Sequence, residues 1–118
     1  MSGGKRILVV EDELLLAMML EDMIFELGHQ VVGPALNLSD ALSLAKDETL
    51  DCAIIDLNLG RGVLSTPVAE ILRERNIPFA LSTGYGADPQ LDSLGHTHLL
   101  GKPFAMNELR GALDALIG

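Results

Sequence analysis

The sequence predicts an α/β fold in which helices cover both faces of a parallel sheet. Short apolar runs alternate with longer segments of helical character along the whole chain, and several runs are apolar on both faces, as strands buried on both sides are. Neither a linker nor a low-complexity segment interrupts this alternation, and 118 residues suit one domain with a real core. We therefore expect residues 1–118 to form one doubly wound domain with right-handed crossovers.

Five short apolar runs are the predicted strands, because each has the length and composition of a buried strand. They are ILVV at 7–10, QVVG at 30–33, CAIID at 52–56, FALST at 79–83 and HLLG at 98–101.

The segments between the runs carry helix signals. Apolar residues recur at helical spacing over 14–27, and Gly28 is placed to end that helix. Ser39 is placed to cap a second helix, and Thr66 with Pro67 to open a third. The last helix is expected from about Asn107. Its predicted apolar side consists of Leu109, Ala112, Leu113 and Leu116. The polar stretch ADPQLDS has little helical periodicity, so the fourth helix is expected to be short or mobile.

Composition argues against several classes of partner. The chain has 8 Lys and Arg against 17 Asp and Glu, a formal net charge of -9, which disfavours binding to nucleic acids and anionic membranes. Its single cysteine, Cys52, lies in an apolar run and fits a reduced intracellular compartment. The longest apolar run, LLLAMML, is too short to span a bilayer. We expect a cytoplasmic protein that binds neither nucleic acid nor membrane.

Acidic residues stand where predicted strands end. Glu11, Asp12 and Glu13 follow the first strand, and Asp56 ends the third. Carboxylates at a helix entrance have an ordinary explanation, because they favour the positive end of the helix dipole by a fraction of a kcal/mol. Asp56 changes the balance, since carboxylates that meet at one sheet edge repel one another unless a cation lies among them. Oxygen ligands of this kind suit Mg²⁺, or Mn²⁺ in its place.

The fourth and fifth strands deliver groups suited to a phosphoryl ligand. Ser82 and Thr83 end the fourth strand, and Lys102 follows the fifth. A lysine is a good counter-charge for a phosphoryl oxygen, and a hydroxyl can donate a hydrogen bond to another. A carboxylate can be the nucleophile in phosphoryl transfer, which forms an aspartyl-phosphate. Asp56 is the best placed carboxylate for that role.

The set ED after the first strand, D after the third, T after the fourth and KPF after the fifth resembles the receiver domain of two-component response regulators. The resemblance covers the chain almost end to end. It implies a flavodoxin-like fold with strand order 2-1-3-4-5 and five helices, and a site at the switch point between strands one and three. It implies Asp56 as the phosphoacceptor, Thr83 as the switch hydroxyl and Lys102 as the phosphate-contacting lysine. A cis Lys102–Pro103 bond is also implied.

The same resemblance implies a set of metal ligands. Glu11 and Asp12 would be the acidic pair that holds Mg²⁺ together with the acceptor Asp56. The backbone carbonyl of Asn58 would be the third protein ligand.

The stretch LSTGYG, residues 81–86, departs from the common receiver pattern. Receivers commonly carry an aromatic switch residue three positions before the lysine, where this chain has Leu99. The only tyrosine, Tyr85, instead lies between two glycines after Thr83, so we expect this loop to be the switch. PFALSTGYG, with DLNLGRG after the acceptor, resembles the subset known as FAT GUY response regulators.

The resemblance implies a signalling module rather than an enzyme. A sensor histidine kinase or histidine phosphotransfer protein would supply the phosphoryl group, and the output would be protein binding, with no output domain attached. Only weak autophosphorylation and autodephosphorylation are expected. A Mg²⁺-dependent phosphohydrolase of the haloacid-dehalogenase type would carry a second Asp where Asn58 stands. Flavodoxin-like cofactor binding would need a hydroxyl- and glycine-rich loop in place of the acidic VVEDE.

Overall fold

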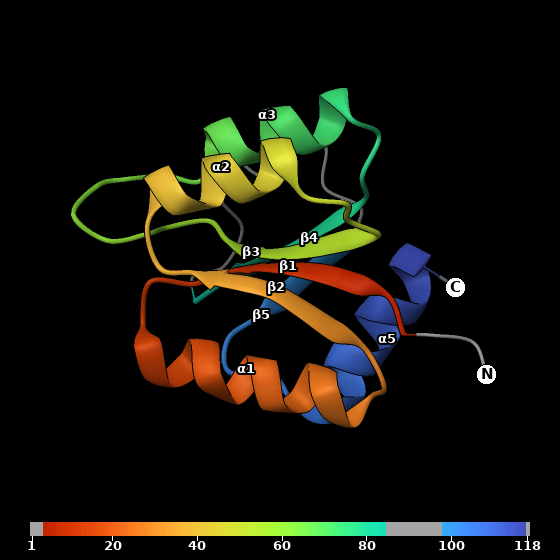
Figure 1. The fold of residues 1–118 in the computed structure, drawn as a ribbon. Coiled ribbons are helices and arrows are strands. Elements are labelled where there is room, and N and C mark those ends of the chain that lie inside the picture. Colours follow the sequence, from red (N-terminus) through yellow and green to blue (C-terminus); the bar gives the residue numbers. More distant parts are fainter. Residues whose placement is uncertain (1–3, 85–97, 118) are drawn as a thin grey trace.

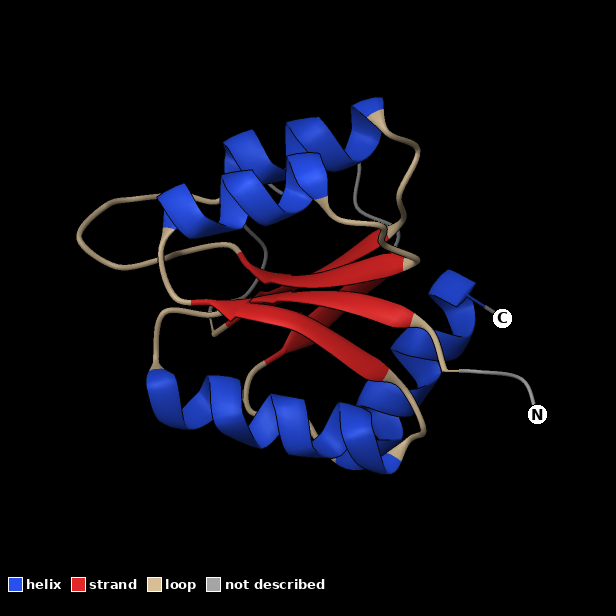
Figure 2. Cartoon of the chain, in the orientation of Figure 1, coloured by secondary structure: helices blue, strands red, loops and turns tan. Residues whose placement is uncertain are grey.

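A computed structural model describes residues 4–84 and 98–117 of the chain. Five parallel strands form its central sheet, in the order β2-β1-β3-β4-β5, which confirms the predicted order. The sheet lies between two layers of helices (Figure 2). The strands are β1 (Arg6–Val10), β2 (Gln30–Ala35), β3 (Cys52–Asp56), β4 (Phe79–Thr83) and β5 (His98–Gly101). Each predicted run is therefore a strand, and β2 continues two residues beyond the predicted end at Gly33.

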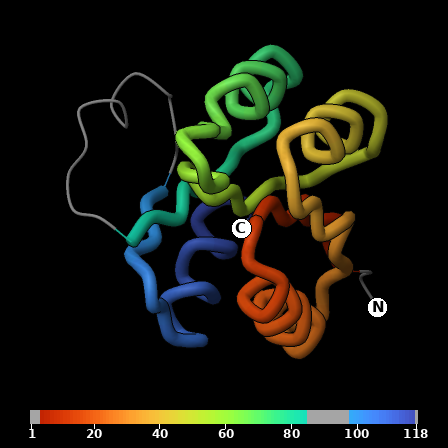
Figure 3. The backbone as a smooth tube through the Cα atoms, turned by 90° about the vertical axis from the view of Figure 1, so that its left-hand side faces the viewer, coloured from red at the N-terminus to blue at the C-terminus, as the bar shows by residue number. Residues whose placement is uncertain are grey.

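Four helices are present among the described residues, and they cover the two faces of the sheet in pairs (Figures 1 and 3). They are α1 (Leu14–Glu26), α2 (Leu38–Asp47), α3 (Thr66–Glu74) and α5 (Met106–Ile117). The helices α1 and α5 lie on one face, and α2 and α3 lie on the other (Figure 1). The predicted fourth helix falls in 85–97, outside the described residues. None of the described helices is long and apolar enough to cross a membrane.

The core consists of two apolar layers, because alternate residues of each buried strand point to opposite faces. Val10 and Ile55 belong to the layer beneath α2 and α3. Val9 and Ile54, one residue earlier, belong to the layer beneath α1 and α5. Cys52 is buried in this second layer, as predicted. Burial, with a smaller contribution from Asp51, raises the pKa of its thiol to about 12, so Cys52 is a core residue rather than a nucleophile.

The N-cap of α2 corrects the sequence-based expectation. Asn37, not Ser39, is the capping residue, and its side chain accepts a hydrogen bond of 2.8 Å from the backbone N–H of Asp40. Ser39 lies inside the helix, in its first turn. Both residues are favourable caps, and the helix begins earlier because Leu38 packs against the core from its first turn.

Replacing Asn37 by Ala is therefore expected to lower the free energy of unfolding by about 1 kcal/mol, because one N–H of the first turn loses its acceptor. Ser39→Ala is the matched control, and its effect should stay within about 0.5 kcal/mol. Urea denaturation of the two variants checks this. A larger loss for Ser39→Ala than for Asn37→Ala would contradict the cap assignment.

Candidate functional site

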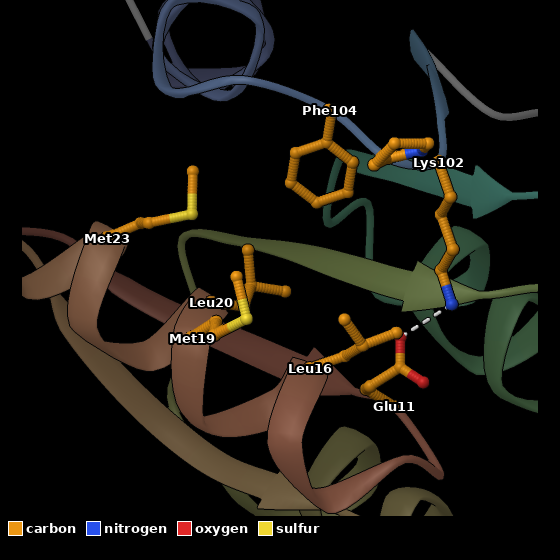
Figure 4. A pocket seen from close by; sticks show the side chains of 8 residues that line it. Glu11, Leu16, Met19, Leu20, Met23, Lys102 and Phe104 are labelled. Atoms are coloured by element: carbon orange, nitrogen blue, oxygen red, sulfur yellow. Dashed lines mark hydrogen bonds and ion pairs between the residues drawn. The ribbon is translucent and has the colours of Figure 1, made fainter.

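The carboxyl ends of β1, β3 and β5 bring two carboxylates and one ammonium group together. Glu11 follows β1, Asp56 ends β3 and Lys102 follows β5. Lys102 Nζ lies 2.7 Å from Glu11 Oε1 and 2.9 Å from Asp56 Oδ2; the contact with Glu11 is drawn in Figure 4. Both acidic residues are nearly fully buried, with exposed fractions of 4% for Glu11 and 6% for Asp56. The lysine therefore bridges two buried negative charges.

Backbone hydrogen bonds on both sides hold Glu11 in place. Its N–H donates to the carbonyl of Ala35 in β2 at 3.0 Å, and its Oε2 accepts from the N–H of Glu13 at 3.1 Å. The first bond follows an irregularity in the β1–β2 pairing, beside Gly33, whose φ is +98°. A Cβ at Gly33 would lie 2.7 Å from the backbone nitrogen of Ala35, so glycine is required there. The end of β2 thus fixes the position of Glu11 at the carboxyl edge of the sheet.

The loop between β3 and α3, residues 57–65, extends from the carboxyl edge of the sheet (Figure 1) and lines the site on its other side. The N–H of Asn58 donates to Asp56 Oδ1 at 3.3 Å, and the side-chain oxygen of Asn58 accepts from the N–H of Gly60 at 2.8 Å. Gly60 has a φ of +89°, and a Cβ there would lie 3.1 Å from Asp12 Oδ2. Gly60 therefore leaves room for the Asp12 carboxylate beside the site.

The electrostatics of the site raise the pKa of Asp56 in the metal-free protein. Burial raises the pKa of Asp56 to about 6, and the negative charge of Glu11 acts in the same direction. The hydrogen bond and charge of Lys102 and the N–H of Asn58 oppose this rise. Burial alone would lower the pKa of Lys102, but its hydrogen bonds to Glu11 and Asp56 outweigh burial and raise it. Lys102 is thus charged, and Asp56, whose pKa of about 6 lies well above the ordinary 3.8, is mostly a carboxylate at pH 7.

The donor set fits a hard divalent cation. One carboxylate oxygen from each of Glu11, Asp12 and Asp56 lies within 4.8 Å of the others. Such a group of carboxylate oxygens is the ligand chemistry that suits Mg²⁺ or Mn²⁺. A cation there would also offset the repulsion among the carboxylates, which one ammonium group neutralises only in part.

An open pocket of about 480 Å³ leads to these groups. Its lining includes every predicted site residue except Glu11 and Tyr85: Asp12, Asp56, Asn58, Thr83 and Lys102. Glu11 does not line this pocket, but it contacts Lys102, which does. Tyr85 lies outside the described residues. The Lys102–Pro103 bond is cis, as the resemblance implies, and Gly33–Pro34 is a second cis bond that sequence reasoning missed.

Sequence reasoning also missed an apolar pocket of about 290 Å³ beside the Glu11–Lys102 ion pair (Figure 4). Four side chains of α1 line it together with Pro103 and Phe104. They are Leu16, Met19, Leu20 and Met23. The sequence signal that could have indicated this pocket is the apolar run at 14–20, which contains more apolar residues than a helix with one buried face requires.

Comparisons with known proteins agree with this geometry. The profile of the response regulator receiver domain matches residues 7–114. The transcriptional regulatory protein PdtaR of Mycobacterium tuberculosis is 28% identical over 116 residues, which are 96% of this chain and 57% of that protein. This chain thus spans little more than half of that relative's length.

Two solved structures are similar over nearly their full length. SdrG from Sphingomonas melonis Fr1 is 42% identical, with a TM-score of 0.83 and complete coverage of both chains. The receiver domain of a sensor histidine kinase from Pseudomonas aeruginosa PAO1 is 25% identical, with a TM-score of 0.86 and coverage of 98% and 99%; it has a magnesium ion coordinated in its active site cleft. The resemblance to receiver domains is confirmed, and the narrower FAT GUY assignment stays a prediction.

Proposed function

Because the chain belongs to the response regulator receiver domain family, we propose that residues 1–118 form one receiver domain that accepts a phosphoryl group on Asp56. The observation that carries the proposal is the cluster of Glu11, Asp12 and Asp56 beside Lys102, which an open pocket reaches from solvent. This arrangement provides a nucleophile, ligands for a divalent cation and a counter-charge for the transferred group.

Mg²⁺, with Mn²⁺ as a substitute, is the proposed cofactor. Carboxylate oxygens of Glu11, Asp12 and Asp56 and the backbone carbonyl of Asn58 would hold it. When bound, the cation neutralises negative charge on the transferring phosphoryl group. The magnesium ion in the similar receiver domain from Pseudomonas aeruginosa supports this choice.

In the transfer step, a carboxylate oxygen of Asp56 attacks phosphorus. An O–P bond forms as the bond between phosphorus and the donor breaks, and the donor leaves with that electron pair; a histidine donor then takes up a proton. The attack requires the ionised carboxylate, whose pKa of about 6 leaves most of it available above that pH. Lys102, already 2.9 Å from Asp56 Oδ2, supplies a positive charge for a phosphoryl oxygen.

The switch is proposed to begin at Thr83, which is 5% exposed and lines the pocket with Asp56. Its hydroxyl would engage the phosphoryl group, and the adjoining loop with Tyr85 would change shape. This would alter the affinity for a protein partner, so turnover of a substrate is not the output.

The proposed phosphodonor is a sensor histidine kinase or a histidine phosphotransfer protein, and α1 would be its docking surface. Leu15, Met18 and Met19 are half exposed or more, although they belong to an apolar helix next to the site. The apolar pocket at this helix ends at the Glu11–Lys102 pair (Figure 4). A donor that packs here would bring its phosphohistidine close to Asp56.

The test is phosphorylation by acetyl phosphate, read by intact mass. We expect one phosphoryl adduct on the wild type in Mg²⁺, none in EDTA, and a loss of at least about tenfold for Asp56→Asn, because an amide is a far weaker nucleophile than a carboxylate. Asp22→Asn, an exposed carboxylate of α1, is the matched control and should be labelled as the wild type is. An adduct that persists in Asp56→Asn, or that forms equally without divalent cations, would contradict the proposal.

A further inference from the structure

The side chain of Ser82 in β4 is buried without a hydrogen-bond partner among the described residues. It is 3% exposed, and its hydroxyl is the buried side-chain group there that lacks a partner. An unpaired buried hydroxyl lowers stability, and alanine at such a position is usually neutral or favourable. Because native proteins satisfy nearly all buried polar groups, this hydroxyl requires an explanation.

Strand alternation places Ser82 in the same layer as the charged groups of the site. Four residues at the strand ends each stand two positions after a member of the apolar layer beneath α1 and α5. In order, they are Glu11, Asp56, Ser82 and Lys102. The layer members that precede them are Val9, Ile54, Ala80 and Leu100. Residues two apart in a strand share a face. Ser82 also pairs in register with Asp56. Its hydroxyl therefore belongs to the polar end of this layer.

The side chain of Lys102 crosses the strand that carries Ser82. In the sheet, β4 lies between β3 and β5. The backbone N–H of Lys102 donates to the carbonyl of Thr83 at 2.8 Å, which continues the β4–β5 ladder. The ammonium group of Lys102 nevertheless reaches Asp56 at the end of β3 and Glu11, which directly follows β1. The lysine side chain must pass over the end of β4, on the face that Ser82 occupies.

We propose that Ser82 is a positioning residue for Lys102, whose ammonium group donates to the Ser82 hydroxyl once Asp56 carries the phosphoryl group. This inference rests on the proposed function. The ammonium group has three N–H donors, and Glu11 and Asp56 accept two of them in the present state. Transfer converts one Asp56 oxygen into the bridging oxygen of an acyl phosphate, which weakens that contact. The Ser82 hydroxyl then keeps Lys102 directed at the phosphoryl oxygen.

Ser82→Ala separates this role from a purely structural one, because the two predict opposite patterns. In the metal-free, unphosphorylated protein we expect the variant to unfold at the same temperature as the wild type or higher. With acetyl phosphate and Mg²⁺ we expect labelling to slow by about tenfold, because the hydrogen bond from Lys102 to Ser82 already forms as the phosphoryl group is transferred, and a hydrogen bond to a charged group is worth about that factor. Ser82→Thr, which keeps the hydroxyl, should recover most of the rate, and Ser82→Cys, which keeps the volume, should not.

A double-mutant cycle tests whether Ser82 acts through Lys102. Ser82→Ala should have no further effect in a Lys102→Met background. The cycle is read as the shift in melting temperature produced by Mg²⁺ with beryllium fluoride, a phosphoryl analogue, which needs no turnover. A wild-type labelling rate in Ser82→Ala, or equal effects in both backgrounds, would overturn the inference while leaving the proposed function intact. Failure of the wild type to form any adduct would instead overturn the proposed function.

Discussion

Lys102→Met is expected to be the most destabilising single change at the site in the metal-free protein at neutral pH. It would leave Glu11 and Asp56 buried beside each other without the cation that lies within 2.9 Å of both. Removal of one partner from a buried ion pair lowers the free energy of unfolding by about 3–5 kcal/mol, and the partial exposure of Lys102 places the expected loss at about 2–4 kcal/mol. Thermal and urea denaturation in EDTA measure it.

Three controls identify the cause of that loss. Lys46→Met removes an exposed lysine and should change stability by less than about 0.5 kcal/mol. Saturating Mg²⁺ should narrow the gap between wild type and Lys102→Met, because the cation supplies the missing positive charge. Glu11→Gln in the Lys102→Met background should recover stability, since it removes one of the two repelling charges. If neither Mg²⁺ nor Glu11→Gln restores stability, the lysine acts through packing instead of charge.

The predictable part of the site is the set of residues that strand ends deliver to one edge of the sheet. Asp56 and Lys102 were identifiable because the carboxyl ends of parallel strands meet there, whichever helices connect them. The bridge from Lys102 to Glu11 was not predicted, because it requires the lysine side chain to cross β4, and the conformation of a long side chain over the small side chain at Ser82 cannot be derived from strand order.

Local chemistry also limits what sequence reasoning can place. Asn37 and Ser39 are both good caps two residues apart, and tertiary packing of Leu38 decides between them. The positive φ of Gly60 and its approach to Asp12 depend on the course of the 57–65 loop, for which the stretch LNLGRG gives only a turn signal. Tyr85 and the fourth helix lie outside the described residues, so the expectations for them stay predictions.

Asp56→Asn is expected to affect stability in the opposite direction to Lys102→Met and to raise the free energy of unfolding of the metal-free protein. The unfolded chain has the ordinary Asp pKa of 3.8, and burial with the charge of Glu11 raises the folded value to about 6. Between these values the folded protein retains a proton that the unfolded chain has lost, so stability falls as pH rises through this window and stays low above it. The ionised acceptor therefore lowers stability at pH 7, by about 1–3 kcal/mol. Asparagine avoids this penalty, and its oxygen can still accept from Lys102.

The pH dependence of the difference between Asp56→Asn and wild type is the decisive measurement, because contributions from the other carboxylates cancel. In EDTA the extra stability of Asp56→Asn over the wild type should reach its full value above about pH 6 and should vanish towards about pH 4. Mg²⁺ should reduce it at neutral pH by stabilising only the protein with the intact carboxylate cluster. A variant less stable than the wild type at pH 7 without metal would show that Lys102 more than offsets the burial of Asp56. The two substitutions together thus test one property: the metal-free site holds more negative charge than its lysine neutralises, and that excess is what favours a divalent cation before the phosphoryl group arrives.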